Sequence, residues 1–168
     1  MLHDVPDGIV PSLPARGPRI RGLSTLQSEF VLSRNHIGQL SFIVRGQPEL
    51  LPLHYVYADG AIISRTTYGP KCAAWAERPH VAFGVEEIDG LFDWRSVIVR
   101  GRIRILSRHG TREERADYWR AIVIARTLIP ETLTERDPTP ERRIVFEISP
   151  EQITGREAST RFLSRSQP

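Results

Sequence analysis

Residues 40–66 run LSFIVRGQPELLPLHYVYADGAIISRT, and this stretch decides the fold class of the chain. Apolar and polar side chains alternate along residues 40–45 and again along residues 51–57, which is the pattern of strands with one buried face. Gly46-Gln47-Pro48 turns the chain, and Asp59-Gly60 is a strong hairpin signal. We therefore expect three strands joined as an antiparallel meander that ends at Thr66. The residues predicted to point inward are Leu40, Phe42, Val44, Leu51, Leu53, Tyr55 and Tyr57.

The meander leads into Arg65-Thr66-Thr67-Tyr68-Gly69-Pro70-Lys71, which holds the only lysine of a chain with 22 arginines. Pro70 suits the first turn of a helix, and Thr67 is a candidate N-cap. A helix N-terminus presents free N–H groups and a positive dipole end, both of which favour phosphate. Lys71 adds a compact, mobile charge. The segment predicts a phosphate site, and the alternative is a simple strand-to-helix turn with a solvated lysine.

The rest of the chain supplies three further strands and three helices. Helices are predicted from Ser24 to about Arg34, with an apolar stripe of Leu26, Phe30 and Val31, over 70–77 before Pro79, and from Thr111 to about Thr127. Strands are predicted at 81–85, 92–106 and 143–148, with a bulge or bend at Gly101. Together these elements predict a mainly β fold with flanking helices, a six-stranded antiparallel closed or split β-barrel.

The predicted organisation is one domain with an extension at each end. Residues 1–20 form a Pro- and Gly-rich extended arm, residues 21–157 the barrel domain, and residues 158–168 a polar tail. The sequence contains no internal repeat and no sign of a second domain boundary.

Composition narrows the class of protein. The chain is 40% apolar and 26% charged, with a net charge of +3. No apolar run approaches the roughly 20 residues of a membrane helix, and the first residues lack the apolar core of a secretory signal. The single cysteine, Cys72, excludes an internal disulfide, so we expect a cytoplasmic protein. Cys72 at a helix start is either a reactive thiol or a small buried side chain, and burial is favoured.

Two kinds of partner are not expected. The arginines are scattered among acidic and apolar neighbours, which argues against nucleic-acid binding. The five histidines have no metal-ligand spacing among themselves or with Cys72, so no metal site is predicted.

Seven motifs in their order along residues 22–157 resemble a known family. They are Leu23-Ser24, Ile37-Gly38-Gln39-Leu40-Ser41-Phe42, Pro52-Leu53-His54-Tyr55-Val56-Tyr57, the Arg65 to Lys71 segment, Val81-Ala82-Phe83, Trp94-Arg95-Ser96-Val97-Ile98-Val99-Arg100-Gly101 and Ile153-Thr154-Gly155-Arg156. The chain resembles the FMN-binding split-barrel proteins of the pyridoxamine 5′-phosphate oxidase-like superfamily, and looks most similar to the nitroimidazole-resistance-type branch.

The resemblance implies FMN held at a homodimer interface, with two subunits completing each site. The flavin phosphate would lie against Thr66, Thr67 and Lys71, and the backbone of residues 52–56 would run along the isoalloxazine ring. The cofactor-binding set that the resemblance implies is Pro52, Leu53, His54, Tyr55, Val56, Arg65, Thr66, Thr67, Lys71, Trp94, Arg95 and Ser96.

Three departures from the family pattern bear on the activity. His54 stands where many relatives carry asparagine, and it is the candidate catalytic residue, with a partly buried histidine of the barrel wall as the alternative. Residues 149–168 lack the Arg-x-His segment of the pyridoxamine phosphate oxidases proper, and Ser64 stands where nitroimidazole-type relatives often carry histidine. These two departures argue against both pyridoxamine phosphate oxidation and nitroimidazole reduction as the activity.

The function expected on this basis is an FMN-dependent oxidoreductase with a small-molecule substrate and NADH or NADPH as candidate reductant. The alternative is a non-catalytic module that binds or senses a flavin, the deazaflavin F420 or haem.

Overall fold

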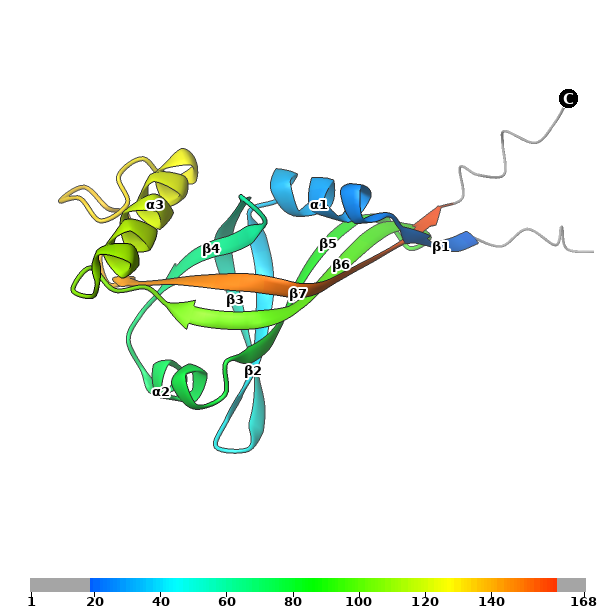
Figure 1. Cartoon of the computed structure of the whole chain (residues 1–168). Coiled ribbons are helices and arrows are strands. Elements are labelled where there is room, and N and C mark those ends of the chain that lie inside the picture. The colour runs from blue at the N-terminus through cyan, green and yellow to red at the C-terminus, as the bar shows by residue number, and fades with distance from the viewer. Residues whose placement is uncertain (1–18, 160–168) are drawn as a thin grey trace, which may run out of the picture.

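The computed structural model describes residues 19–159, which form a strongly curved antiparallel sheet with three helices on its outside (Figure 1). Most of the predicted arm and nearly all of the predicted tail lie outside the described residues. The elements are β1 (Arg19–Leu23), α1 (Thr25–Arg34), β2 (Ile37–Val44), β3 (Gln47–Ala58), β4 (Ala61–Thr66), α2 (Pro70–Glu77), β5 (His80–Gly90), β6 (Asp93–Ile105), α3 (Arg112–Leu128) and β7 (Ile144–Ser159).

The sheet closes on itself. Its strand order is β1-β7-β4-β3-β2-β5-β6, and β7 also pairs with β6, so the six strands β2 to β7 form a ring. The predicted six-stranded antiparallel barrel is confirmed. The seventh strand, β1, was not predicted: it pairs with the end of β7, where Arg19 faces Ser159 and Leu23 faces Gly155.

β7 is the longest strand and is much longer than predicted, because it continues past Ile148 to Ser159. Its first half pairs with β4, its second half with β1, and its other side with β6 throughout. The predicted irregularity at Gly101 is confirmed: Arg100 faces Gln152 but Gly101 faces Pro150, so β7 carries the extra residue. A Cβ on Gly101 would overlap the Ser149 carbonyl oxygen.

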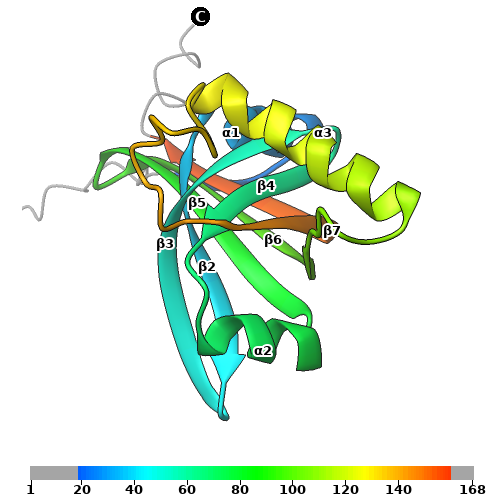
Figure 2. The same ribbon diagram turned by 90° about the vertical axis from the view of Figure 1, so that its left-hand side faces the viewer.

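The apolar residues pack into two clusters. The larger fills the barrel and includes Leu40, Leu53 and Phe83. α2 closes one end of the barrel with Trp75, whose ring centroid lies 5.5 Å from that of Phe42 and 5.0 Å from that of Phe146. The second cluster lies where α3 crosses the outside of β4 and β7 (Figure 2). This packing places α2 and α3 at different parts of the barrel wall.

The predicted apolar stripe of α1 is wrong in two of its three residues. Ser24 caps the helix with a complete capping box, as expected for its start. The buried face, however, is Ser28, Val31 and Leu32, while Leu26 and Phe30 are 79% and 60% exposed. The helix therefore turns a different side to the barrel than its apolar spacing indicated.

None of the helices within residues 19–159 is long and apolar enough to span a membrane. Cys72 is buried, as predicted.

The close approach at Gly101 yields a stability prediction. Gly101→Ala should lower the free energy of unfolding by about 1–3 kcal/mol, because the new methyl group would force β6 away from the bulge in β7. Gly22→Ala is the control, since no atom lies within 4 Å of the Cβ it would add. Urea denaturation of both variants measures the difference. Equal midpoints for the two would contradict the close approach.

Candidate functional site

The barrel is split between β3 and β4. β3 pairs with β2 from Gln47 to His54, but its pairing with β4 covers only Tyr55 to Ala58. β4 instead continues along β7, where Arg65 faces Val145 and Thr66 faces Ile144. Within residues 19–159, the β3 edge from about Gln47 to Leu53 therefore has no neighbouring strand on the β4 side. We call this segment the open edge of β3.

The alternation of backbone groups along β3 decides which N–H groups face the open edge. The Tyr55 N–H donates to the His36 carbonyl oxygen at 3.0 Å, so the N–H groups of alternate residues, Leu50 and His54 among them, point to the other side. Pro48 and Pro52 occupy the same alternate positions and have no N–H to offer. The edge is thus protected against the addition of another strand, and few of its donors remain.

A second group of polar atoms lies where β4 leads into α2. The predicted cap is wrong: Gly69 is the N-cap, and no side chain caps the helix. Thr67 Oγ1 instead accepts a hydrogen bond from Lys71 Nζ at 3.2 Å. Pro70 occupies the first turn, as expected. A hydroxyl, an ammonium and an uncapped helix start therefore come together in one short segment, which is the donor set that suits a phosphate.

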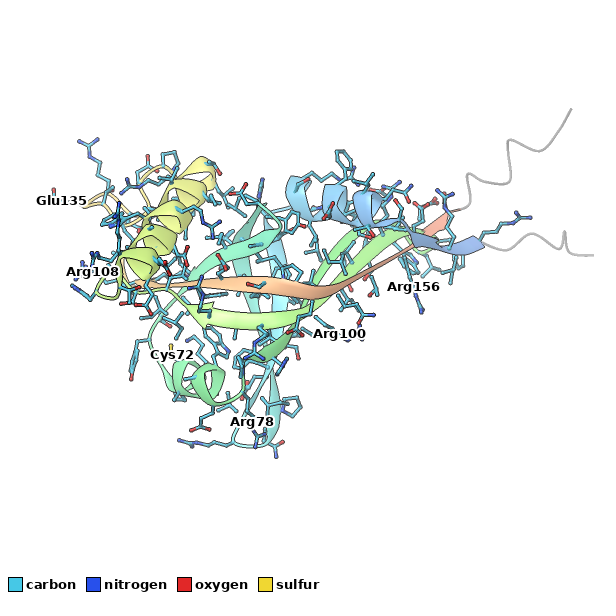
Figure 3. The ribbon with its side chains drawn as sticks, in the orientation of Figure 1. Cys72, Arg78, Arg100, Arg108, Glu135 and Arg156 are labelled. Carbon is cyan, nitrogen blue, oxygen red and sulfur yellow. The ribbon has the colours of Figure 1, made fainter. Side chains whose placement is uncertain are left out.

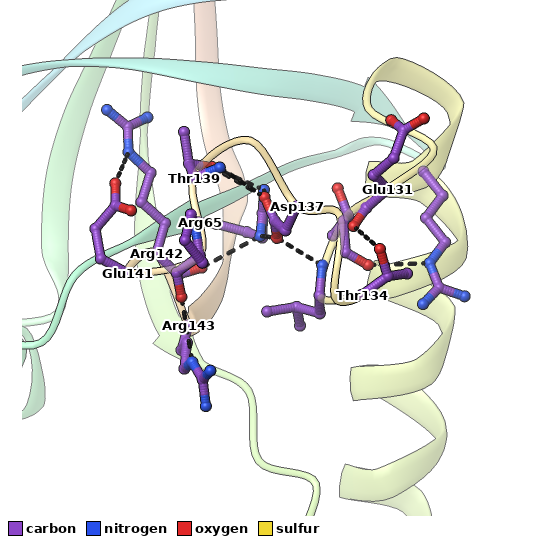
Figure 4. Close-up of polar contacts among 12 residues, drawn as sticks. Arg65, Glu131, Thr134, Asp137, Thr139, Glu141, Arg142 and Arg143 are labelled. Carbon is purple, nitrogen blue, oxygen red and sulfur yellow. Dashed lines mark hydrogen bonds and ion pairs between the residues drawn. The ribbon is translucent and has the colours of Figure 1, made fainter.

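Arg65 is engaged elsewhere. Its guanidinium donates to Asp137 at 2.5 and 3.2 Å, to Thr139 Oγ1 at 3.2 Å and to the Arg142 carbonyl oxygen at 3.3 Å (Figure 4). Hydrogen bonds from Arg65, together with those from the backbone of Leu133 and Thr139, hold the pKa of Asp137 well below its ordinary value. The pair anchors residues 129–143 to β4. The sequence contains no pattern that singles out Asp137, which stands in a polar, proline-bearing loop.

The β3 residues of the predicted set separate into two faces. Leu53 and Tyr55 are buried in the barrel, and the Tyr55 hydroxyl donates to the Leu32 carbonyl oxygen at 2.8 Å. The Tyr55 N–H donates to His36 and Leu53 pairs with Gly38, so the backbone polar groups of both residues face β2 rather than the open edge. Pro52 and His54 are exposed on the outer face, and His54 lines a narrow cleft with Ser64 and the end of α3. The Ser64 hydroxyl donates to the His54 carbonyl oxygen at 2.6 Å, which fixes the backbone at the mouth of the split.

Trp94, Arg95 and Ser96 lie at the opposite end of the barrel from α2 (Figure 1). At about 3.3 Å per residue, Trp94 is about 26 Å along β6 from Arg102, the residue that faces His80 just after α2. Arg95 Nε donates to Glu157 at 3.1 Å, and its Nη1 to Glu87 at 3.5 Å. One chain therefore does not bring these residues to Lys71.

Ser96 does face a groove on the outside of the barrel. This groove of about 720 Å³ runs across β2, β5 and β6, and we call it the β2–β5–β6 groove. Large apolar side chains line it and are exposed in the single chain. They are Ile37, Leu50, Ile88 and Ile98.

Glu87, beside this groove, anchors a network of charges. Burial alone would raise its pKa, but hydrogen bonds from Arg34, Asn35 and Arg95 bring the pKa below the ordinary value. Arg34 Nε donates to Glu87 at 2.5 Å. The network joins the end of α1 to β5 and β6, and its carboxylate stays ionised at neutral pH.

Comparison with known proteins agrees with this architecture. The chain is 29% identical to an FAD-binding protein from Mesorhizobium loti, with a TM-score of 0.64, over 85% of this chain and 99% of that one. It is 22% identical to the FAD binding protein from Mycobacterium smegmatis, with a TM-score of 0.55, over 83% of this chain and 98% of that one. It is 15% identical to a candidate 5-nitroimidazole antibiotic resistance protein from Bacteroides thetaiotaomicron, with a TM-score of 0.60, over 84% of this chain and 89% of that one. None of the curated proteins matches the chain.

A family profile described as pyridoxamine 5′-phosphate oxidase matches residues 26–157, which include β2 to β6 and all but the last two residues of β7. The split between β3 and β4, the helix start at Lys71 and the outer groove all lie within that match. The chain therefore belongs to the pyridoxamine 5′-phosphate oxidase family.

Proposed function

We propose that the chain binds FMN, with the phosphate at the start of α2 and the isoalloxazine ring along the open edge of β3. The observation that carries the proposal is the uncapped helix start, where Lys71 Nζ and Thr67 Oγ1 lie 3.2 Å apart at the split of the barrel. Two structural relatives that are FAD-binding proteins by name support a flavin. One ammonium, one hydroxyl and one helix start match a single phosphate group, which favours FMN over FAD.

The rest of the predicted set takes more limited parts in this proposal. Thr66 is buried and orients the strand end, while Pro52 and His54 offer an outward surface and the His54 N–H to the polar edge of the ring. Leu53 and Tyr55 hold the strand in place from the β2 side, and Val56 does so from the β4 side. Arg65 acts indirectly, because its guanidinium is committed to Asp137.

Lys71 should bind the phosphate rather than the ring. Lys71→Met should weaken FMN binding about 10- to 100-fold, because a hydrogen bond to a charged group is lost, and should change riboflavin binding little. Arg78→Met is the matched control, since Arg78 is exposed at the other end of α2. Quenching of flavin fluorescence measures each affinity, and FAD is titrated alongside. Equal losses for FMN and riboflavin would refute the phosphate role.

We also propose that two copies of the chain complete each flavin site. The β3 edge and Lys71 lie far along the barrel from Trp94, Arg95 and Ser96, so a partner is needed to bring the two groups together. The β2–β5–β6 groove offers the surface, because monomeric proteins seldom expose a contiguous lining of this kind. A second copy related by a two-fold axis would bury the same residues on both sides. Ser96 at the groove would then approach the partner's flavin.

The dimer proposal predicts a change of mass in solution. Ile37→Glu should convert a dimer into monomers and weaken FMN binding, because a carboxylate would be buried at the interface. Val123→Glu on α3 is the control: Ile37 is 65% and Val123 67% exposed in the single chain. Sedimentation velocity reports the mass. A wild-type monomer, or equal effects of both substitutions, would contradict this interface.

The reaction we propose is FMN-dependent oxidation or reduction of a small molecule. A bound flavin supplies the hydride or electron transfer, and the chain positions it and limits the access of water. His54, exposed at the mouth of the split, is the candidate proton donor or acceptor. We place this reaction in the cytoplasm, where NADH and NADPH are available as reductants.

Oxidation of NADH or NADPH by the FMN-loaded protein would distinguish an oxidoreductase from a protein that only carries flavin. The FMN-loaded protein should oxidise NADH or NADPH in the presence of an electron acceptor. His54→Gln should lower kcat about 100-fold with little change in FMN affinity, whereas His80→Gln, an exposed histidine on β5, should not. Stopped-flow absorbance follows the flavin. Tight FMN binding with no turnover of either nicotinamide would favour the non-catalytic module.

A further inference from the structure

A second cavity lies on the other side of residues 129–143 from the split. It has a volume of about 700 Å³, within the range of small-molecule sites, and we call it the α3 cavity. Its walls are α3, the turn after β6 and the loop before β7. Figure 3 shows Arg108 and Glu135, two of its lining residues, at the α3 end of the molecule. None of the residues proposed to bind FMN lines it.

The cavity is basic. Arg108, Arg126 and Arg143 line it, and within residues 19–159 none of the three has an ion pair with a carboxylate. Arg120 of the same helix differs, since it pairs with Glu147 at 2.6 Å, whereas the exposed Arg112 and Arg115 have no carboxylate ion pair either. Of the two carboxylates at the cavity, Asp137 is neutralised by Arg65. Three positive charges therefore face Glu135 alone.

The three guanidinium groups use only part of their hydrogen-bonding capacity within residues 19–159. In each of them Nε donates one hydrogen bond: Arg108 to His109 Nε2 at 2.9 Å, Arg126 to the Thr132 carbonyl oxygen at 3.2 Å, and Arg143 to the Pro140 carbonyl oxygen at 3.2 Å. Among the described residues, the terminal nitrogens of all three have no hydrogen-bond acceptor. Figure 4 shows the Arg143 side chain extending away from the Arg65–Asp137 pair. A guanidinium bonded through Nε keeps its terminal N–H groups available to a carboxylate, sulfonate or phosphate.

The floor of the cavity is apolar. Leu106 and Ile122 are buried beneath it, and Ile105 and Leu133 contribute to its sides. Trp119 is 56% exposed, with its ring edge-on to Tyr118 at a centroid distance of 5.3 Å. A large aromatic side chain held by a neighbour but open on one side is suited to stack against a flat ligand.

We propose that the α3 cavity is a binding site for an organic anion with an aromatic or extended apolar body. The anionic group would bind the terminal nitrogens of Arg126 and Arg143, with Arg108 at the rim, and the body would lie against Trp119 and the apolar floor. The site does not depend on the flavin, because its walls share no residue with the proposed flavin contacts.

Two dyes of nearly the same shape test the proposal. The probe is 8-anilinonaphthalene-1-sulfonate, and N-phenyl-1-naphthylamine is its uncharged counterpart. FMN-saturated protein should bind the sulfonate with one site per chain, and the uncharged dye about tenfold or more weakly. The double variant Arg126→Gln with Arg143→Gln should lose about tenfold or more in affinity for the sulfonate and nothing for the uncharged dye.

Controls separate this site from general dye binding. Arg112→Gln removes an exposed arginine from α3 outside the cavity and should leave both affinities unchanged. Trp119→Phe should remove most of the tryptophan quenching caused by the sulfonate, which is a readout independent of the arginines. The proposal would be overturned if the Arg112 variant lost as much affinity for the sulfonate as the double variant, or if the double variant bound both dyes equally more weakly. It would also be overturned if FMN added to flavin-free protein displaced the sulfonate. Failure of FMN to bind at all would leave this result standing and refute only the flavin proposal.

Discussion

The pairing of β7 with β6 on one side, and with β4 and then β1 on the other, is the constraint on which the rest of the structure depends. β4 pairs with β3 along one edge only from Ala61 to Ser64, and with β7 along its other edge from Ile62 to Thr66. Beyond Ser64 it keeps its pairing with β7 and diverges from β3, so the edge of β3 opens at that point. The strand that joins β3 to β7 in the ring is therefore also the strand whose divergence opens the candidate flavin site. The prolines at 48 and 52 fit this position, because an open edge with a full row of N–H groups would invite another strand.

The Arg65–Asp137 pair connects the two proposed sites. Arg65 extends from the strand that leaves β3, and Asp137 belongs to the loop that lines both the His54 cleft and the α3 cavity. Removing either partner would leave a buried charge, which is far more costly than losing an exposed ion pair. The geometry of that loop is therefore set by a buried pair rather than by the loop's own sequence.

The meander from Leu40 to Thr66, the helix starts at Ser24 and Thr111 and the irregularity at Gly101 could be predicted, because each rests on local spacing or local backbone chemistry. β1 and the second half of β7 could not be predicted, because both segments are polar and contain proline or glycine. Each is stabilised as a strand mainly by pairing with neighbouring strands. The stripe on α1 failed because the side of the helix that is buried depends on tertiary packing, which left Leu26 and Phe30 exposed. Of the candidate site, the Lys71 segment was found by its residue types, whereas the open edge of β3 and the role of Asp137 depend on topology.

The two large hollows of the molecule have opposite character, and this suggests how they are used. The β2–β5–β6 groove exposes isoleucine and leucine, and its one arginine, Arg34, is paired with Glu87, which suits burial against a second copy. Glu86, which also lines the groove, has no ion pair within residues 19–159. The α3 cavity keeps three arginines without carboxylate partners among the described residues, and burying those charges in an interface would cost more than leaving them hydrated. The hollows share no lining residue, so a dimer formed through the groove would leave the α3 cavity of each subunit open to solvent. In the proposed dimer the basic cavity would stay available to a dissolved anion, while the proposed flavin would lie between subunits.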